Sequence, residues 1–422
     1  MKYVVLQGDG MADWPIAELG NKTPLEYART PNMDRIASLG VLGMTHTIPD
    51  GYPSGSDVGT MSLLGYDPRR YHTGRSPIEA ASMGVELSPT DIAFRCNLVT
   101  LGPGTNGEET MVDFSSGHIS SEEAAEVIRA INAELGTDDI SFYPGVSYRH
   151  LMVWHDGKEK MQTTPPHDIT DQPTAGHFPT GEGSECLLDL MLRSREILAA
   201  HPVNKKRRQN GQRPASSIWL WGQGRRPAVP TIKERFGCEG SVISAVDLVR
   251  GIGVLAGLEV ILVPGATGFL DTNYLGKAEY GLAELRKKDF LFLHVEATDE
   301  AGHMGAPDKK VQALEDFDQK VVGTILDGLQ EFPEWRVLVM PDHATPCAIK
   351  THSTDPVPFA ILSSEDVKRG VKKPVSYNET SAKGTGVVVS EAWQILERFV
   401  RGEVSQPKND TEGAAYGPQL SS

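Results

Sequence analysis

The sequence predicts an α/β protein whose core domain is interrupted by an inserted α+β domain. Two observations predict this fold class. Strands alternate with helices at both ends of the chain, in residues 1–80 and 245–345, whereas the middle has regular Asx and Gly turns and fewer long apolar runs. A chain of 422 residues is also too long for one ordinary core. The predicted parts are a discontinuous core of residues 1–84 plus 241–402, an insertion of residues 85–240, and a polar, disordered tail of residues 403–422.

The alternating elements follow from the apolar pattern. The N-terminal part predicts a strand at 3–7, a helix over Pro31–Leu39 and a strand over Val41–His46. The longest predicted helix, Pro307–Gln330, begins with a proline suited to a first turn and carries apolar residues at three-to-four spacing. The C-terminal part predicts three helix–strand pairs: Ala245–Ala256 with Leu258–Val263, Thr272–Arg286 with Phe290–Val295, and Pro307–Gln330 with Arg336–Met340.

Composition limits the classes of partner. With 41 basic and 56 acidic residues the formal charge is −15, which argues against nucleic acid but allows a small anionic substrate. The four cysteines form no CxxC pair, so a reducing cytoplasm is the simplest expectation. The N-terminus has no signal-peptide pattern and no apolar stretch approaches a membrane span. The basic stretch Asn204–Ala215 is expected to be a solvated surface loop. The oligomeric state is not predicted.

Acidic and imidazole side chains follow three of the apolar runs. Asp9 follows Val4–Leu6, Asp299 follows Phe290–Val295, and Asp342-His343 follows Val337–Met340. Strand ends that meet at one edge of a sheet would gather these side chains into a two-metal site, which suits phosphoryl transfer. His303 stands four residues after Asp299, and His352 lies in another irregular segment. A mixed Asp/His set favours manganese or zinc over calcium, with magnesium a weaker match.

A nucleophile is expected in Gly55–Ser62, a glycine-flanked loop that enters a helix. A hydroxyl at this position would lie at the partial positive end of the helix, and a nearby cation would activate it. The residues alone leave four candidates open, and the alternative is that one of them is only a helix cap. These candidates are Ser54, Ser56, Thr60 and Ser62.

The ordered set Gly8-Asp9-Gly10, Gly55–Gly59, Asp299xxxHis303, Asp342-His343 and His352 resembles the alkaline phosphatase superfamily. More specifically, the chain resembles the archaeal-type cofactor-independent phosphoglycerate mutases over residues 1–400. The stretches TPLEYARTPNMDRIASLG, YHTGRSPIEAASMGVEL, IAFRCNLVT and HVEATDEAGH carry this second resemblance. It implies an alkaline-phosphatase-like three-layer core and an isomerase of glycolysis and gluconeogenesis.

The resemblance also implies roles for single residues. Ser56 would be the nucleophile that becomes phosphorylated, and Lys277 would lie near the transferred phosphate. Two divalent cations are implied, most simply Mn²⁺ with Zn²⁺, Co²⁺ or Mg²⁺ as alternatives, and no bisphosphoglycerate. One cation would be held by Asp9, Ser56, Asp342 and His343, and the other by Asp299, His303 and His352. The expected reaction interconverts 3-phosphoglycerate and 2-phosphoglycerate. The alternatives are a metal-dependent phosphatase and a phosphotransferase that substitutes for homoserine kinase.

The insertion is expected to close over the phosphoserine, exclude water and hold the glycerate while it reorients. Its candidates for substrate binding are Arg95, Asn97, Arg149, His150, His167, Asp168, Arg225 and Arg226. His118 departs from the family pattern, which usually has arginine there. If His118 faces the substrate, 3-phosphoglycerate is not necessarily the preferred one.

Overall fold

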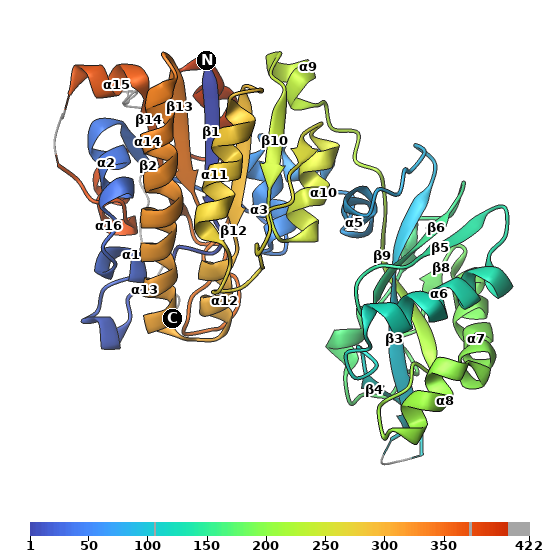
Figure 1. The fold of residues 1–422 in the computed structure, drawn as a ribbon. Helices are drawn as coiled ribbons and strands as arrows, with labels where there is room; N and C mark the ends of the chain where they lie inside the picture. The colour runs from blue at the N-terminus through green and yellow to red at the C-terminus, as the bar shows by residue number, and fades with distance from the viewer. Residues whose placement is uncertain (105–106, 371–373, 404–422) are drawn as a thin grey trace. The chain divides into compact units, whose positions relative to one another are not determined.

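The computed structural model describes residues 1–104, 107–370 and 374–403, and the chain forms two compact units (Figure 1). Unit 1 comprises Met1–Gly65 and Leu262–Ser422, and unit 2 comprises Tyr66–Ile261. Unit 2 therefore encloses the predicted insertion, residues 85–240. The predicted disordered tail, residues 403–422, lies outside the described residues except for Glu403.

The centre of unit 1 is a sheet whose three neighbouring strands β12, β1 and β13 are parallel. In both pairs Gln7 marks the register, opposite His294 on one side and Met340 on the other. Val4, Val5 and Leu6 are fully buried, as expected for strands covered on both faces. The sheet continues through an antiparallel strand, β14. The strand bounds, in spatial order, are β12 Phe290–Val295, β1 Lys2–Gly8, β13 Trp335–Met340, β14 Val357–Ser363, β2 Val41–Thr45 and β15 Val388–Val389.

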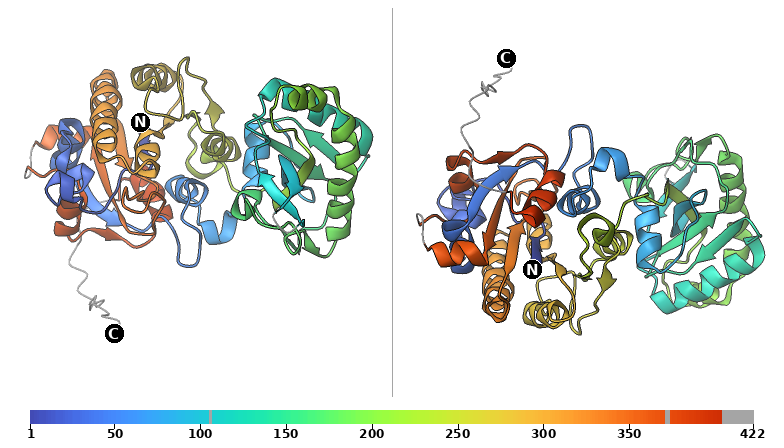
Figure 2. Two further views of the ribbon diagram at one scale, coloured as in Figure 1. Left: turned by 90° about the horizontal axis from the view of Figure 1, so that it is seen from below. Right: turned by 90° about the horizontal axis from the view of Figure 1, so that it is seen from above.

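Helices cover both faces of this sheet, which gives unit 1 three layers (Figure 2). Tyr3 of β1 packs edge-on against Phe399 of α17, whereas Leu291 of β12, the register partner of Val4, lies beneath Gly281 of α11. Since successive strand residues point to opposite faces, α17 and α11 lie on different faces. The helices are α1 Pro24–Tyr27, α2 Pro31–Leu39, α3 Ser56–Leu63, α11 Tyr274–Leu285, α12 Ala297–His303, α15 Ser364–Arg369, α16 Glu379–Gly384 and α17 Trp393–Arg401, with a short η1 Ala17–Leu19.

The predicted helix Pro307–Gln330 contains a π-helical segment. It is built as α13 Pro307–Asp316, a π turn η3 Phe317–Gly323, α14 Thr324–Gly328 and a 3₁₀ turn η4 Leu329–Glu331. Within the π turn, Asp318 accepts hydrogen bonds from Met33 N at 2.7 Å and Asn32 N at 3.2 Å. The carboxylate therefore satisfies backbone donors in the first turn of α2, which have no partner within that helix.

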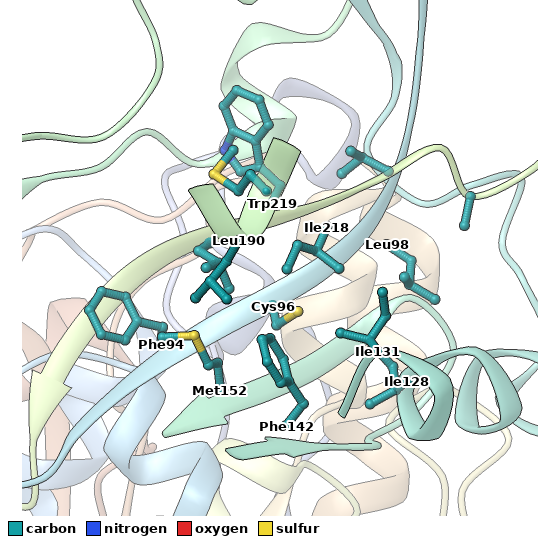
Figure 3. Close-up of a cluster of buried hydrophobic side chains, with 14 of the residues drawn as sticks. Phe94, Cys96, Leu98, Ile128, Ile131, Phe142, Met152, Leu190, Ile218 and Trp219 are labelled. Carbon is teal, nitrogen blue, oxygen red and sulfur yellow. The ribbon is translucent and has the colours of Figure 1, made fainter. Parts of the chain in front are cut away.

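Unit 2 contains an antiparallel sheet built around β3, which pairs with β4, β6 and β9. One face of the sheet is covered by α6 and α7, and Figure 3 shows the core on this face, with Leu98 of β3 near Ile131 of α6 and Phe94 of β3 near Met152 of β6. Helix α5 packs on the other face against Ala93, Leu151 and Val153. The bounds are β3 Ile92–Pro103, β4 Glu109–Asp113, β5 Ile140–Tyr143, β6 Arg149–Trp154, β9 Ser217–Arg225, α4 Pro68–Tyr71, α5 Ser76–Ser82, α6 Ser121–Leu135, α7 Ser184–Ala200 and α8 Pro202–Gln209.

The remaining elements of unit 2 are short, apart from α10. The strand predicted over Leu258–Val263 is reduced to β11, Glu259–Val260, which pairs in parallel with β10. These elements are β7 Met161–Gln162, β8 Thr180–Gly181, η2 Pro166–Ile169, α9 Ile232–Phe236, β10 Gly240–Ile243 and α10 Asp247–Leu255. Within the described residues, no helix of either unit is both long and apolar enough to cross a bilayer.

The interpretation of Asn204–Ala215 as a solvated loop is wrong. Its first six residues belong to helix α8, and Asn204 and Arg207 are buried. Arg207 donates to Glu123 Oε2 at 2.5 Å and to the carbonyl of Ser116 at 2.7 Å, while Asn204 Nδ2 donates to two further carbonyls. Pro202 at the first helical position starts a helix, and one face of that helix points inward. The high charge of the segment led to the prediction of a loop, although one side of the helix is buried.

Candidate metal centre

The parallel strands β12, β1 and β13 end level with one another, and each is followed by predicted ligands. Asp9 stands one residue beyond β1, Asp299 lies in α12 just beyond β12, and Asp342 stands two residues beyond β13. Carboxyl ends of parallel strands are the usual binding edge of α/β sheets. Gly10 and Gly59 allow the close approach, because a Cβ at Gly10 would lie 2.7 Å from Asp299 Oδ1 and one at Gly59 would lie 2.5 Å from the carbonyl of Asp342.

The first cluster consists of Asp9, Asp342 and His343, whose ligand atoms lie within 4.8 Å of one another. All three side chains are fully buried. His343 Nε2 lies 3.6 Å from Asp9 Oδ1, 3.3 Å from Asp342 Oδ2 and 3.3 Å from Ser56 Oγ. The structure thus brings together the four residues predicted for one cation.

The second cluster surrounds Asp299. His303 Nε2 lies 3.1 Å from Asp299 Oδ2, and His352 Nε2 lies 3.4 Å from Asp299 Oδ1. His303 and Asp299 share the helix α12, where a spacing of four residues places both on one side. His343 also belongs to a group within 4.8 Å of Asp299 and His352. The two clusters are therefore adjacent.

The histidine tautomers suit a cation. His303 Nδ1 lies 3.0 Å from the carbonyl of Lys350, and His352 Nδ1 lies 3.0 Å from the carbonyl of Ser54. A carbonyl only accepts, so each Nδ1 carries a proton, and each Nε2 presents a lone pair to a cation once it has lost its own proton. Yet the two Nε2 atoms face each other at 2.9 Å. Two lone pairs at that distance repel unless a proton or a cation lies between them. Backbone carbonyls that fix the ring in this way are typical partners of metal-binding histidines.

The carboxylates of the first cluster also need a positive charge. Asp9 Oδ1 and Asp342 Oδ2 are buried and meet no hydrogen-bond donor within residues 1–104, 107–370 and 374–403. Burial and the nearby Asp342, Glu296 and Asp299 raise the pKa of Asp9 well above its ordinary value. Buried carboxylates are usually paired or coordinate metals. The residues present therefore fit divalent cations.

The second cluster has the opposite electrostatic balance. Burial by itself would raise the pKa of Asp299, but hydrogen bonds from His303 and His352 outweigh it and hold the pKa well below its ordinary value. The hydrogen bond to Asp299 raises the pKa of His303 to about 9. This carboxylate already has cationic partners, so a metal bound here would displace protons from the imidazoles.

Geometry distinguishes the four hydroxyls that the sequence left open. Ser56 is the first residue of α3, and its Oγ faces His343 Nε2. The other three make structural bonds: Ser54 Oγ donates to the carbonyl of His352, Thr60 Oγ1 donates to Gln7 Oε1, and Ser62 Oγ donates to the carbonyl of Thr47. Among the four, Ser56 is the one directed at the metal-type residues.

Two residues of this edge, His294 and Glu296, were not predicted. His294, inside the apolar run of β12, places Nε2 2.8 Å from Asp9 Oδ2 and 3.2 Å from Glu296 Oε2. A polar residue in an otherwise apolar buried strand was the available signal.

Lys277, predicted to lie near the phosphate, is fully buried in α11, and its Nζ donates to the carbonyl of His294 at 3.1 Å. It is not a solvent-facing helix lysine.

In unit 2, several of the predicted substrate-binding residues gather around Trp221. The guanidinium of Arg95 lies 4.4 Å from the Trp221 ring, and the His167 ring lies 5.3 Å from it. Trp221 Nε1 donates to Asn97 Oδ1 at 3.0 Å. Burial lowers the pKa of Arg95 against the opposing charge of Glu79, and the nearby Arg75 and Arg149 lower it further. We call this group, Arg95, Asn97, Arg149, His167 and Trp221, the cationic face.

Other candidates are placed differently. His150 follows Arg149 on β6 and points to the opposite side of the sheet, where it is 2% exposed and its Nδ1 accepts from Gly145 N. Arg225 Nε donates to Glu159 Oε2 at 2.9 Å. Asp168 is exposed beside His167, and His118 is exposed with its ring 6.0 Å from that of Tyr148. Arg226 is exposed. The structure therefore does not bring His150 and Arg225 to the cationic face.

Comparison with known proteins gives a consistent set of relatives. A family model described as 2,3-bisphosphoglycerate-independent phosphoglycerate mutase matches residues 37–204. The probable mutase of that name from Geobacter sulfurreducens is 54% identical over 95% of this chain and 100% of its own length. The Methanosarcina acetivorans mutase is 52% identical, again over 95% of this chain and all of its own length.

Two solved structures share the fold. The PH0037 protein from Pyrococcus horikoshii has a TM-score of 0.78 and 30% identity, covering 95% of this chain and 96% of that one. The cofactor-independent phosphoglycerate mutase from Thermoplasma acidophilum has a TM-score of 0.66 and 26% identity, covering 95% and 99%. With the three layers of unit 1, this confirms the predicted fold class of a three-layer α/β core with an inserted α+β part, which the chain shares with a cofactor-independent phosphoglycerate mutase.

Proposed function

The chain belongs to the archaeal-type 2,3-bisphosphoglycerate-independent phosphoglycerate mutases, and we propose that it interconverts 3-phosphoglycerate and 2-phosphoglycerate. The observation that supports this most is the position of Ser56. Its hydroxyl lies at the start of α3, 3.3 Å from His343 Nε2 and near Asp9 and Asp342, each of which has one buried carboxylate oxygen without a donor among the described residues. A covalent phosphoserine route needs such a hydroxyl.

The reaction proceeds in two phosphoryl transfers, first to Ser56 and then back to the glycerate. Ser56 Oγ attacks phosphorus, a new O–P bond forms, the bond to the 3-oxygen breaks, and the proton lost by Ser56 is balanced by the proton that the 3-oxygen gains. The freed glycerate then turns and its 2-hydroxyl attacks the phosphoserine. This second transfer regenerates the serine hydroxyl and releases 2-phosphoglycerate. The N-terminus of α3 stabilises the negative charge near Ser56 in both steps.

Two divalent cations, most simply Mn²⁺, are proposed to complete the centre. Asp9, Asp342, His343 and Ser56 would hold one, and Asp299, His303 and His352 would hold the other. When bound, they supply Lewis-acid stabilisation of the transferred phosphoryl oxygens and lower the pKa of the attacking hydroxyl. Lys277, buried one hydrogen bond from β12, is proposed to add a fixed positive charge near the phosphate.

The cationic face is proposed to bind the carboxylate of the substrate. Arg95 and Arg149 lie on the same side of the sheet, because Arg95 and Asn97 are two residues apart on β3 and Asn97 pairs with Arg149. A planar guanidinium can grip a carboxylate through two hydrogen bonds. Asp168, beside His167, is proposed to contact a hydroxyl. Substrate roles for His150, Arg225 and Arg226 remain predictions.

A phosphorus NMR time course tests this function. The purified protein is stripped with EDTA, then given MnCl₂ and 3-phosphoglycerate. The expected result is loss of turnover on stripping, its return with Mn²⁺, and a growing 2-phosphoglycerate signal without inorganic phosphate. Faster release of inorganic phosphate would favour the phosphatase alternative. The same tube with homoserine and a nucleoside triphosphate tests the phosphotransferase alternative through the appearance of phosphohomoserine.

A further inference from the structure

Asp9 is surrounded by a polar network that the proposed mechanism does not use. His294 Nε2 contacts Asp9 Oδ2 at 2.8 Å, and Gln7 Nε2 donates to the same oxygen at 3.3 Å. Behind them, Glu296 Oε2 lies 3.2 Å from His294 Nε2, and Thr60 Oγ1 donates to Gln7 Oε1 at 3.2 Å. Gln7, Thr60 and His294 are fully buried.

The strand register explains why these side chains meet. Gln7 is the register partner of His294, so both point to the same face of the sheet. Asp9 and Glu296 each follow two residues later in their own chains, which keeps them on that face where the strands end. Helix α3 covers the same region, because its Thr60 contacts Gln7. The network therefore joins two strand ends to the helix that carries Ser56.

The chemistry of the contacts sets the proton position. Gln7 Nε2 donates to Asp9 Oδ2, so this oxygen is an acceptor, and the matching tautomer of His294 carries its proton on Nε2 and donates to the same oxygen. Both donors, from His294 and Gln7, are directed at Oδ2 of Asp9. Oδ1 receives none within the part of the chain that is described, and it points toward His343. Oδ2 of Asp9 therefore accepts hydrogen bonds, whereas Oδ1 faces the other predicted metal ligands.

We infer that the buried side chains of His294 and Gln7 form a positioning device that holds Asp9 by one oxygen and presents the other to a cation. Glu296 lies beside His294, but its Oε2 makes no hydrogen bond among the described residues. The inference rests on the proposed function only in taking Asp9 as a ligand. It assigns a role to residues that act through Asp9 and do not touch the substrate.

The rival interpretation is a third cation held by Asp9, His294 and Glu296, whose ligand atoms lie within 4.8 Å of one another. Two contacts oppose it. The Nε2 that would face the cation already makes a hydrogen bond with Asp9 Oδ2 at 2.8 Å. The buried ammonium of Lys277 lies 3.1 Å from the carbonyl of His294, and a second cation beside it would be repelled.

Calorimetric titration of the EDTA-stripped protein with MnCl₂ tests the inference. The wild type is expected to bind two Mn²⁺ per chain. His294→Leu removes the donor and is expected to weaken one of the two sites by about 10- to 100-fold, the usual effect of removing an outer partner, and to leave the other unchanged. His155→Leu, the same change at a half-buried histidine that pairs with Asp91 in unit 2, is the matched control and keeps both affinities.

Two further variants complete the test. His294→Gln places an amide donor near the position of Nε2 and is expected to restore the weakened site, whereas the shorter His294→Asn is not. This pair decides the question if His294→Leu fails to fold. Unchanged affinities in His294→Leu and His294→Asn, equal weakening of both sites, or three Mn²⁺ per wild-type chain with the third lost in Glu296→Gln would each overturn the inference. Failure of the mutase assay with a split titration would overturn the function and leave the inference standing.

Discussion

Unit 1 and unit 2 each gather charged side chains at one part of a sheet, but they position them differently. At the edge of unit 1 the predicted ligands stand in loops directly after parallel strands, and backbone carbonyls fix the histidine rings. In unit 2 the cationic face lies on the strands themselves and depends on antiparallel pairing around β3. A loop after a strand is visible in a sequence. Which face of a strand a residue occupies depends on the register.

The largest effect is expected in unit 1, where one variant should lose catalysis and keep metal binding. Ser56→Ala removes the proposed nucleophile and should lower kcat by at least about 10⁴-fold, as deletion of a covalent nucleophile does in other enzymes. Manganese binding should persist through Asp9, Asp342 and His343. Steady-state turnover and calorimetry on the same sample measure both.

Ser62→Ala is the matched control for that variant. It lies on the same helix, but its hydroxyl donates to the carbonyl of Thr47 at 2.7 Å. Loss of this bond should cost about 1 kcal/mol of stability and leave kcat near the wild-type value. Full turnover in Ser56→Ala would show that another group accepts the phosphoryl group.

The cationic face is expected to contribute to binding. Arg149→Met removes an exposed guanidinium that lies 5.8 Å from the Tyr148 ring, so it should fold normally. A charged hydrogen bond to a carboxylate contributes about 1.5–3 kcal/mol, so KM for 3-phosphoglycerate should rise by about 10- to 100-fold with a smaller change in kcat. Initial rates across a range of substrate concentrations measure this.

Arg225→Met sharpens the comparison within unit 2. Arg225 is already engaged by Glu159 and by the carbonyls of Pro89 and Thr90. Its loss should reduce stability slightly and leave KM unchanged. Equal KM effects in Arg149→Met and Arg225→Met would mean that the residues of the cationic face have been assigned wrongly.

The same difference explains what the sequence could predict. Asp9, Asp299 and Asp342-His343 were found because each follows an apolar strand, and the structure brings them together. Ser56 could not be chosen from the residues alone, since Thr60 and Ser62 differ from it only in the direction their hydroxyls take on α3. The family resemblance singles out Ser56, and the structure places its hydroxyl beside His343. His294 was missed because a histidine inside an apolar strand is usually a core residue.

In unit 2, the alternating directions of side chains along a strand could have separated the candidates for substrate binding, but the predictions did not use this alternation. Arg149 and His150 are adjacent on β6, and adjacent strand residues point to opposite faces, so both could not join one surface. His150 pairs in register with Cys96, a residue of the hydrophobic core. The extent of β3 and its bulge opposite β9 decide which side faces outward, and these depend on tertiary pairing.

The smallest expected effect tests whether His150 belongs to the core side. Burial lowers the pKa of His150 to about 3, so it stays neutral in the folded protein. An unfolded histidine has a pKa near 6.5, so below that pH the unfolded state binds more protons and stability falls as pH falls. Between pH 7.5 and 5.5 this one group should cost the wild type roughly 1.3 kcal/mol.

His150→Asn keeps an acceptor for Gly145 N but does not titrate. The smaller side chain should lower stability at every pH, so the informative quantity is the change between pH 7.5 and 5.5. Urea unfolding of the EDTA-stripped proteins, followed by tryptophan fluorescence, should show a smaller pH-dependent loss in the variant than in the wild type. An identical loss in both would mean that His150 can take up a proton in the folded state. In that case it would be accessible to ligands, and its place on the core side of unit 2 would have to be abandoned.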